Sequence, residues 1–146
     1  MRRNVQTFLP VPSFTESAAM LDRQRLGKQR VETMQILRAL TGLTKGWVHH
    51  PAVKMWRGYE SCLADYGAAM CHEWINRGYK DTCLPHFLRQ PGQAPAPPWL
   101  GNADFHRSHQ SNLVRKLAEH YGPLFPGVPD DLPYVWPAPV AVVGVR

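Results

Sequence analysis

Residues 21–32, LDRQRLGKQRVE, concentrate side chains that can bind anions and transfer protons. The stretch contains two carboxylates, Asp22 and Glu32, and four cations: Arg23, Arg25, Lys28 and Arg30. On a helix, one side would carry Arg25, Lys28, Gln29 and Glu32, and Val31 and Met34 would face the core. Such a face could hold a polyanion beside an acid–base group. An ordinary surface ion pair between Lys28 and Glu32 is the simpler alternative.

A second basic stretch, HRSHQSNLVRK at residues 106–116, is expected on another helix. It combines cationic or titratable side chains with polar ones that can hydrogen-bond phosphates or sugars. These residues are His106, Arg107, Ser108, His109, Ser111, Asn112, Arg115 and Lys116. Two basic helices facing one groove would form a DNA site, whereas a polar solvated face is the alternative.

Composition fits one intracellular, cytoplasmic domain with an anionic partner. The 146 residues carry a formal charge of +6 at a pI near 9.6, which favours phosphate contacts. No apolar run approaches the roughly 20 residues of a bilayer span, and the first residues lack the apolar region of a secretory signal. We therefore expect no membrane partner, and a monomer. The three cysteines show no repeating pair spacing, which favours reduced thiols.

Metal chemistry has little support in the sequence. Cys83 and His86 form C-x-x-H, and His106 and His109 form H-x-x-H, which together would supply four zinc ligands. The two pairs lie in different expected elements, however, and nothing else fixes their geometry. We expect neither a metal nor a cofactor. The chain also has no phosphate-binding glycine loop and no serine-nucleophile elbow.

The helix signals predict an all-α fold. Ser13 and Glu16 match a capping box, so a helix should begin near Phe14 and run to about Leu40, with a bend or interruption at Gly27. A second, long central helix is expected to begin at Pro51 and to end at Gly78, with its apolar stripe toward the core.

A third main helix should be capped by Asn102 or Asp104 and should end before Gly122. A proline-rich loop precedes it, and a proline-rich tail follows from residue 123, in which only AVVGV at residues 141–145 could be a short strand. We predict a single compact domain over residues 1–146, with three main helices, a core over about 6–122 and a tail over 123–146.

Three segments together are similar to a known family, and they span about residues 6–122. They are an extended segment followed by L-D-x-x-R-L-x-K-Q-R, the long stretch HPAVKMWRGYESCLADYGAAMCHEWINRGYKDT, and the later SHQSNLVRK…HYG. This chain resembles the pyrimidine-dimer DNA glycosylases typified by the phage endonuclease V. The resemblance implies an all-α enzyme that kinks damaged duplex DNA, displaces a nucleotide and excises a damaged pyrimidine.

The resemblance also implies a mechanism without metal or diffusible cofactor. An N-terminal α-amine attacks the sugar C1′ to form a Schiff base, a glutamate supports the chemistry, and β-elimination cleaves the strand. Such an amine has a reference pKa near 8, so a useful fraction is neutral at pH 7.

This sequence departs from the family pattern at both catalytic positions. Met1 precedes the bulky Arg2 and is expected to be retained, so the nucleophile is either the Met1 amine or Lys28. Arg25 stands where the family has its glutamate, which leaves Glu32 and Asp22 as substitutes.

The expected DNA contacts follow from position and charge. Lys28 lies near a phosphate-contacting arginine of the family, and Lys116 matches a later DNA-contacting lysine. The remaining predicted contacts are Arg23, Arg25, Arg30, Arg107 and Arg115, the polar His106, His109 and Asn112, the base-reading amides Gln24 and Gln29, and the stacking candidates Trp56 and Trp99. The leading hypothesis is a glycosylase, with or without AP-lyase activity. The alternative is a non-catalytic DNA- or RNA-binding protein on the same scaffold.

Overall fold

The computed structural model describes residues 5–43, 49–88 and 95–137, and in these ranges the protein is all-α. The helices are α1 (Phe14–Met20), α2 (Arg23–Leu40), α3 (Pro51–Lys54), α4 (Glu60–Asn76), α5 (Leu84–Leu88), α6 (Ala103–Lys116) and α7 (Ala118–Tyr121). The three longest, α2, α4 and α6, correspond to the three main helices expected. No helix in these ranges is long and apolar enough to span a membrane.

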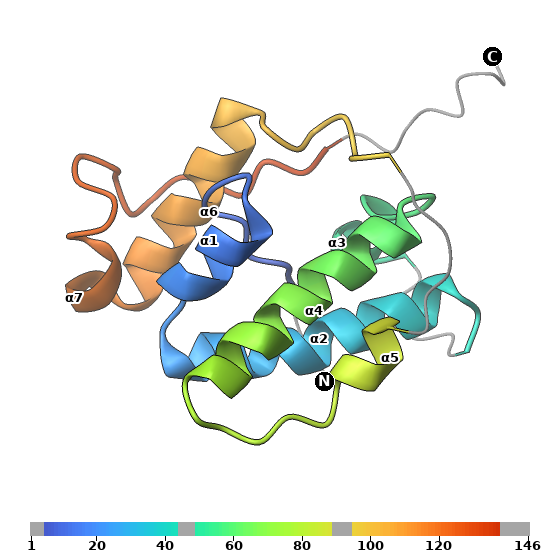
Figure 1. Ribbon diagram of the computed structural model, residues 1–146. Helices are drawn as coiled ribbons and strands as arrows, with labels where there is room; N and C mark the ends of the chain where they lie inside the picture. Colours follow the sequence, from blue (N-terminus) through green and yellow to red (C-terminus); the bar gives the residue numbers. More distant parts are fainter. Residues whose placement is uncertain (1–4, 44–48, 89–94, 138–146) are drawn as a thin grey trace, which may run out of the picture.

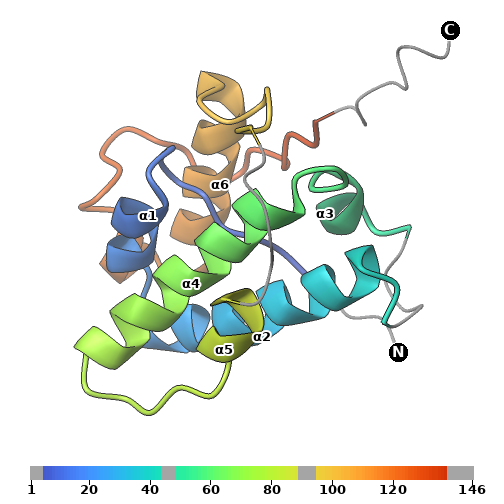
Figure 2. The same ribbon diagram turned by 45° about the vertical axis from the view of Figure 1, so that its right-hand side comes forward.

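Helix α4 organises the core, because it packs against α2, α1 and α5. Figures 1 and 2 show α4 crossing α2, with α6 and α1 on the opposite side of α4 from α5. The α4 side chains Leu63, Tyr66 and Met70 are fully buried, as is Trp56 just before the helix. The apolar stripe predicted for the central helix is therefore a core stripe.

The predicted first helix is two helices. Ser13 does cap a helix at Phe14, since its hydroxyl accepts the Glu16 N–H at 3.1 Å. The chain turns at Leu21, however, and Asp22 caps a new helix by accepting the Arg25 N–H at 3.4 Å. The interruption therefore lies at the start of the basic stretch, at Leu21 and Asp22, and α2 continues through Gly27 to Leu40.

Side chains distant in sequence hold the corner between α1 and α2. The Arg77 guanidinium donates to the carbonyls of Ala18, Ala19 and Leu21, the last at 2.8 Å. The Tyr121 hydroxyl accepts the Asp22 N–H at 2.8 Å. These bonds satisfy carbonyls and an N–H that helix ends otherwise leave unpaired. The corner is therefore fixed by tertiary contacts that a local sequence pattern does not reveal.

Gly27 has a packing role in the middle of α2. A Cβ at this position would lie 3.0 Å from the Trp74 ring of α4. A glycine inside a helix costs about 1 kcal/mol relative to alanine. Here the missing side chain lets α2 and the Trp74 side chain approach closely. The role of Gly27 is therefore packing, and not the bend or interruption expected from the sequence.

The predicted central helix is also divided in two. Pro51 begins α3, where the His50 ring nitrogen Nδ1 accepts the Ala52 N–H at 3.0 Å, but α3 ends at Lys54. Gly58 then adopts a φ of +90°, a conformation that glycine takes at little steric cost. Helix α4 begins at Glu60. The expected stop at Gly78, with φ +97°, is confirmed.

The third helix begins as predicted and ends earlier. Asn102 caps α6 by accepting the Phe105 N–H at 2.9 Å. Helix α6 ends at Lys116, where Leu117 takes an extended φ of −154°, and the short α7 follows. The predicted strand at residues 141–145 lies outside the described residues.

Residues 123–137 form an ordered segment that packs along α6. The Ser111 hydroxyl accepts the Leu132 N–H at 3.0 Å, and the Ser108 hydroxyl accepts the Val135 N–H at 3.1 Å. Asn112 donates to the Leu132 carbonyl at 3.1 Å. This part of the predicted tail is therefore fixed against the domain.

The N-terminal segment around Phe8 is extended, as the sequence indicates, and side chains bind its backbone in place of a neighbouring strand. The buried Gln29 amide accepts the Phe8 N–H at 2.9 Å and donates to the Gln6 carbonyl at 2.9 Å. The Tyr66 hydroxyl donates to the Phe8 carbonyl at 2.7 Å. Buried polar groups of the backbone are thereby satisfied without a sheet.

Two histidines of α6 continue this arrangement at Leu9. His109 Nδ1 accepts the Leu9 N–H at 2.9 Å. His106 Nε2 accepts the Gly101 N–H at 2.9 Å, so its proton is on Nδ1, which lies 2.7 Å from the Leu9 carbonyl. Both rings therefore bind the backbone in their neutral forms.

The buried neutral His109 predicts a loss of stability in acid. Burial lowers its pKa to about 3, and the nearby His106 acts in the same direction. An unfolded histidine titrates near 6.5. Between pH 6.5 and 3 the unfolded chain therefore binds a proton that folded His109 does not, and the free energy of unfolding falls as pH falls. The slope reaches about 1.4 kcal/mol per pH unit.

The matching variant is His109→Asn, whose side-chain oxygen can still accept the Leu9 N–H. Urea unfolding at pH 4.5 and pH 7 should show a smaller pH dependence for this variant than for the wild type. An identical pH dependence would show that His109 is not the group responsible.

Candidate functional site

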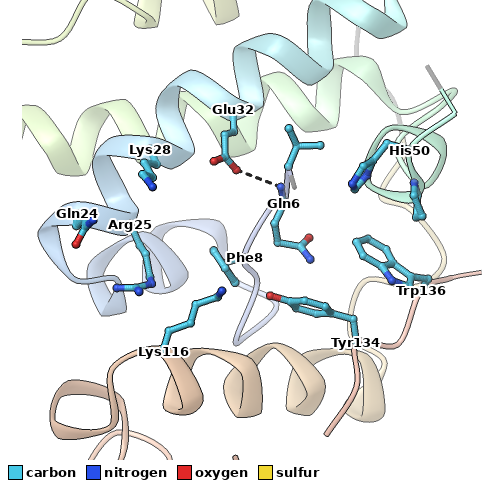
Figure 3. A pocket seen from close by; sticks show the side chains of 12 residues that line it. Gln6, Phe8, Gln24, Arg25, Lys28, Glu32, His50, Lys116, Tyr134 and Trp136 are labelled. Atoms are coloured by element: carbon cyan, nitrogen blue, oxygen red, sulfur yellow. Dashed lines mark hydrogen bonds between the residues drawn. The ribbon is translucent and has the colours of Figure 1, made fainter. Parts of the chain in front are cut away.

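A cavity of about 490 Å³ lies between α2, α6 and the segment 123–137 (Figure 3). It combines cations, one carboxylate and aromatic rings, supplied by elements that are far apart in the sequence. Its lining residues are Val5, Gln6, Phe8, Gln24, Arg25, Lys28, Glu32, His50, Pro51, Lys116, Tyr134 and Trp136.

A second hollow of about 670 Å³ lies along α2 beside Trp74. It shares Val5, Gln24, Lys28 and Glu32 with the first cavity, so these side chains border both spaces. Its other lining residues are Arg23, Gly27, Val31, Gln35 and Trp74. The exposed face of α2 thus carries the predicted Gln24, Lys28 and Glu32 toward two adjoining cavities.

Glu32 is held beside the N-terminal segment. Its Oε1 accepts the Gln6 N–H at 3.2 Å, the interaction drawn in Figure 3. Gln6 is itself fixed by Gln29, as described above. Among the described residues, Glu32 is the one carboxylate that lines either cavity, and it has a defined position next to Lys28 of the same helix.

Asp22, the other predicted carboxylate, lines neither cavity. It caps α2, forms an ion pair with Arg25 at 3.2 Å and accepts a hydrogen bond from the Tyr121 hydroxyl. Burial raises the pKa of Asp22, but the Tyr121 hydrogen bond and the Arg25 charge outweigh it and bring the pKa below its ordinary value. The position of Asp22 is that of a structural group that orients Arg25.

Lys116 enters the first cavity from the end of α6, opposite α2. Figure 3 shows its ammonium group directed into the cavity, toward Phe8 and the Tyr134 hydroxyl. Burial lowers the pKa of Lys116, as do the charges of Arg25, Arg115 and Lys28, whereas Glu32 acts in the opposite direction. The two basic helices predicted from the sequence therefore do contribute to one cavity, through Arg25 and Lys28 on α2 and Lys116 on α6.

The aromatic wall of the cavity was not predicted. Tyr134 and Trp136 pack with ring centroids 5.6 Å apart, and His50 meets Trp136 edge-on at 6.1 Å. Burial raises the pKa of Tyr134, which keeps its hydroxyl protonated. The only sequence signal was the richness of the tail in prolines and aromatics, which does not show where the tail packs.

Several predicted DNA contacts lie away from the cavity because they are buried. Gln29, His106 and His109 bind the N-terminal backbone, and Asn112 binds the segment 123–137. Exposure of each is 5% or less, which leaves no surface for DNA. Conversely, Val31, expected in the core, is 37% exposed. The helical phase predicted for α2 was therefore wrong at Gln29 and Val31.

Arg30 is also placed differently from the prediction. Its guanidinium forms an ion pair with the buried Asp81 at 2.6 Å and stacks over Trp74 at 4.4 Å. Burial raises the pKa of Asp81, but hydrogen bonds from the Leu84 N–H and Arg30 bring it below its ordinary value. Arg30 therefore joins α2 to the loop after α4 and does not line either cavity.

The remaining predicted contacts differ in exposure and in position relative to the cavities. Arg107 is exposed on α6, away from both cavity linings. Arg115 is exposed but donates to Asn112 and to the Asp130 carbonyl. Trp56 and Trp99 are buried against each other, with centroids 5.0 Å apart, so neither can stack on a base. Met1 lies outside the described residues.

The parts of the chain that the structure describes contain no group of three or more side chains suited to a metal ion. Both His106 and His109 have a ring nitrogen bound to the backbone, so they do not form an H-x-x-H pair of free ligands. Cys62, Cys71 and Cys83 are buried free thiols. Burial raises the pKa of Cys62 to about 11, which suppresses its nucleophilic thiolate.

The fold and site thus define a small all-α protein with a basic cavity around one carboxylate. Comparison with protein families matches residues 5–85 to the pyrimidine dimer DNA glycosylases. The chain belongs to this family, as the sequence motifs indicated, and is an enzyme of the glycosylase kind that acts on DNA. Comparison with curated proteins gave no match, and comparison with solved structures gave none. The matched region contains Lys28 and Glu32, whereas Lys116, Tyr134 and Trp136 lie beyond it.

Proposed function

We propose that this protein excises a damaged pyrimidine from an extruded nucleotide in duplex DNA and then cleaves the strand as an AP lyase. The observation that carries the proposal is the cavity that places Glu32 among Arg25, Lys28 and Lys116. Its volume of about 490 Å³ falls within the range of pockets for small organic ligands, and suits a nucleotide. An enzyme that reacts at a base or its sugar must bring the nucleotide out of the stack.

The cations of the cavity support binding of the DNA backbone. Arg25 and Lys28 project from α2 and Lys116 from α6, so phosphates on both sides of an extruded nucleotide can be bound. Asp22 restrains the Arg25 guanidinium, which reduces the entropy lost on binding. Neutralising phosphates releases counterions, so affinity should fall steeply as salt concentration rises.

The proposed chemistry begins at the glycosidic bond. As this bond breaks, its electron pair leaves with the base, which takes up a proton, and positive charge develops on the sugar until water adds to C1′ and loses a proton. The carboxylate of Glu32 stabilises this charge in a partly desolvated cavity, where electrostatic interactions are stronger than in water. In the lyase step an amine condenses with the C1′ aldehyde of the ring-opened sugar, and water leaves to give a protonated imine. A proton then leaves C2′, and the C3′–O bond breaks with its electrons passing to the phosphate.

The test uses a labelled duplex that contains one cyclobutane pyrimidine dimer, and the same duplex without damage. Under single turnover, cleavage of the dimer strand after alkali reports glycosidic cleavage, and cleavage without alkali reports the lyase. We expect both for the dimer and neither for undamaged DNA. Tight binding without any cleavage, equal for both duplexes, would instead support the non-catalytic DNA-binding protein.

The aromatic wall makes a separate prediction about base recognition. Trp136→Ala should lower cleavage of dimer DNA by about tenfold or more, because base–aromatic stacking contributes roughly 1–3 kcal/mol. Cleavage of a duplex with a preformed abasic site, which has no base to stack, should change less than about threefold. Trp136→Phe serves as the conservative variant. Equal losses on both substrates would show that Trp136 supports the fold or the backbone contacts.

A further inference from the structure

We infer that Tyr121 is a positioning residue that acts through Asp22 on Arg25, so that the Arg25 guanidinium is preorganised to bind a DNA phosphate. This inference rests on the DNA binding proposed above, and it adds a residue for which no role was expected. Tyr121 also lies outside residues 5–85, the region that matches the family. Three hydrogen-bonded side chains, and the edge of Arg25 that they leave free, support this role.

The Tyr121 side chain is fixed where α7 meets the corner between α1 and α2. It is the last residue of α7 and is fully buried, and its ring stacks on Phe125 with centroids 6.3 Å apart. The Nε2 of its neighbour His120 donates to the Met20 carbonyl at the end of α1, at 2.8 Å. The Tyr121 hydroxyl therefore has a defined position at the start of α2.

Two hydrogen bonds join Tyr121 to Asp22, the N-cap of α2. The hydroxyl oxygen accepts the Asp22 N–H at 2.8 Å, and the hydroxyl donates its proton to Asp22 Oδ1. Burial raises the pKa of Tyr121, as does the hydrogen bond to Asp22, so the hydroxyl stays protonated and remains a donor. Rotation of the Asp22 carboxylate would break its bond to this buried side chain.

The fixed Asp22 carboxylate in turn orients Arg25. Arg25 Nη1 lies 3.2 Å from both Oδ1 and Oδ2 of Asp22, and the Arg25 backbone N–H donates to Oδ2 at 3.4 Å. Within residues 5–43, 49–88 and 95–137, Nε and Nη2 of Arg25 have no hydrogen-bond partner. These two nitrogens form one edge of the guanidinium, with parallel N–H groups.

This free edge suits a phosphate of the DNA backbone. Parallel N–H groups can donate to two phosphate oxygens at once, and such bidentate pairs are among the strong hydrogen bonds in proteins. Arg25 lines the cavity with Lys28 and Lys116 (Figure 3). Burial lowers the pKa of Lys116, and the charges of Arg25 and Lys28 act in the same direction. A phosphate among these cations would offset their mutual repulsion.

The experiment is a double-mutant cycle of Tyr121→Phe and Arg25→Met, with affinity for a dimer-containing duplex measured by fluorescence anisotropy. Tyr121→Phe changes no charge and should weaken binding about three- to tenfold, the usual effect of ordering one flexible side chain. In the Arg25→Met background it should change affinity less than about 1.5-fold, because Tyr121 acts through Arg25. Cleavage at saturating protein should stay within about twofold of the wild type, since only binding is affected.

Two further variants serve as controls. Asn102→Ala also removes a side-chain hydrogen bond to a backbone N–H, at the cap of α6, so it controls for reduced stability and should bind like the wild type. Arg25→Lys keeps the charge but has no second N–H edge, so it should weaken binding about threefold or more.

The outcomes separate this inference from the function on which it rests. An equal loss of affinity from Tyr121→Phe in both backgrounds would show that Tyr121 supports only the fold, and unchanged affinity would show that Arg25 does not depend on it. Either result would overturn the positioning role, while wild-type cleavage of the dimer would leave the proposed function intact. A wild type that neither binds nor cleaves this duplex would overturn both.

Discussion

Glu32→Gln is expected to lower single-turnover cleavage of dimer-containing DNA by about 10²–10³-fold, the usual cost of removing one group that stabilises charge in the transition state. The substitution removes the negative charge that faces the cavity. It retains a side-chain oxygen that can accept the Gln6 N–H, so the N-terminal segment should stay in place. DNA affinity should change less than about threefold, because Glu32 is anionic and does not bind phosphates.

The matched control for this prediction is Glu16→Gln. Glu16 is an exposed carboxylate of α1 that lines neither cavity, and its replacement should leave cleavage unchanged. Both variants would be compared by cleavage rate at saturating protein and by fluorescence anisotropy of labelled duplex. If Glu32→Gln cleaves at the wild-type rate, Glu32 has no part in the chemistry.

Arg30→Met is expected to lower the free energy of unfolding by about 3–5 kcal/mol, since removing one partner of a buried ion pair leaves an uncompensated charge. That charge is Asp81, whose side chain is 1% exposed and which Arg30 contacts at 2.6 Å. The loss would be a large part of the 5–15 kcal/mol that typically stabilises a protein. Urea unfolding monitored by tryptophan fluorescence measures it.

Arg38→Met provides the control, because Arg38 is an exposed arginine on the same helix. It should change stability by less than about 0.5 kcal/mol. The double variant Arg30→Met/Asp81→Leu should be more stable than Arg30→Met alone, since it removes the unpaired carboxylate. A stable Arg30→Met protein with strongly weakened DNA binding would contradict the structural role and restore the phosphate contact expected from the sequence.

The helix starts at Phe14 and Ala103 were predictable because their signals are local. Ser13 and Asn102 each bind an N–H three residues ahead, and short-range capping patterns report such bonds directly. The turn at Leu21 was not predictable, because Arg77 and Tyr121 stabilise it from more than 50 residues away. The break between α3 and α4 at Gly58 was also not predictable. Apolar residues continue at helical spacing on both sides of this glycine, which favours one continuous helix.

The charged residues of the candidate site were predictable from the sequence. Glu32, Lys28, Arg25 and Lys116 line the cavity, and their types and spacing had indicated an anionic ligand. Their separate roles stay predictions for the experiments above. The aromatic wall could not be found, because the contact of Tyr134 with the site depends on how residues 123–137 pack along α6.

The polar residues of α6 show a different limit of sequence interpretation. A pattern such as HRSHQSN is typical of a solvated or nucleic-acid-binding face, yet His106, His109 and Asn112 are buried. Each binds backbone groups of extended segments, which have no neighbouring strand to pair with in the described fold. Hydropathy alone cannot distinguish a buried polar side chain that hydrogen-bonds an extended backbone from one that faces water.

The most direct test of the central claim is the structure of the Glu32→Gln protein bound to a duplex with one pyrimidine dimer. We expect an extruded nucleotide in the cavity between α2 and α6, with Tyr134 and Trp136 against its base and Lys116 near its sugar–phosphate backbone. DNA bound to another face, with this cavity empty and every nucleotide stacked in the duplex, would contradict it.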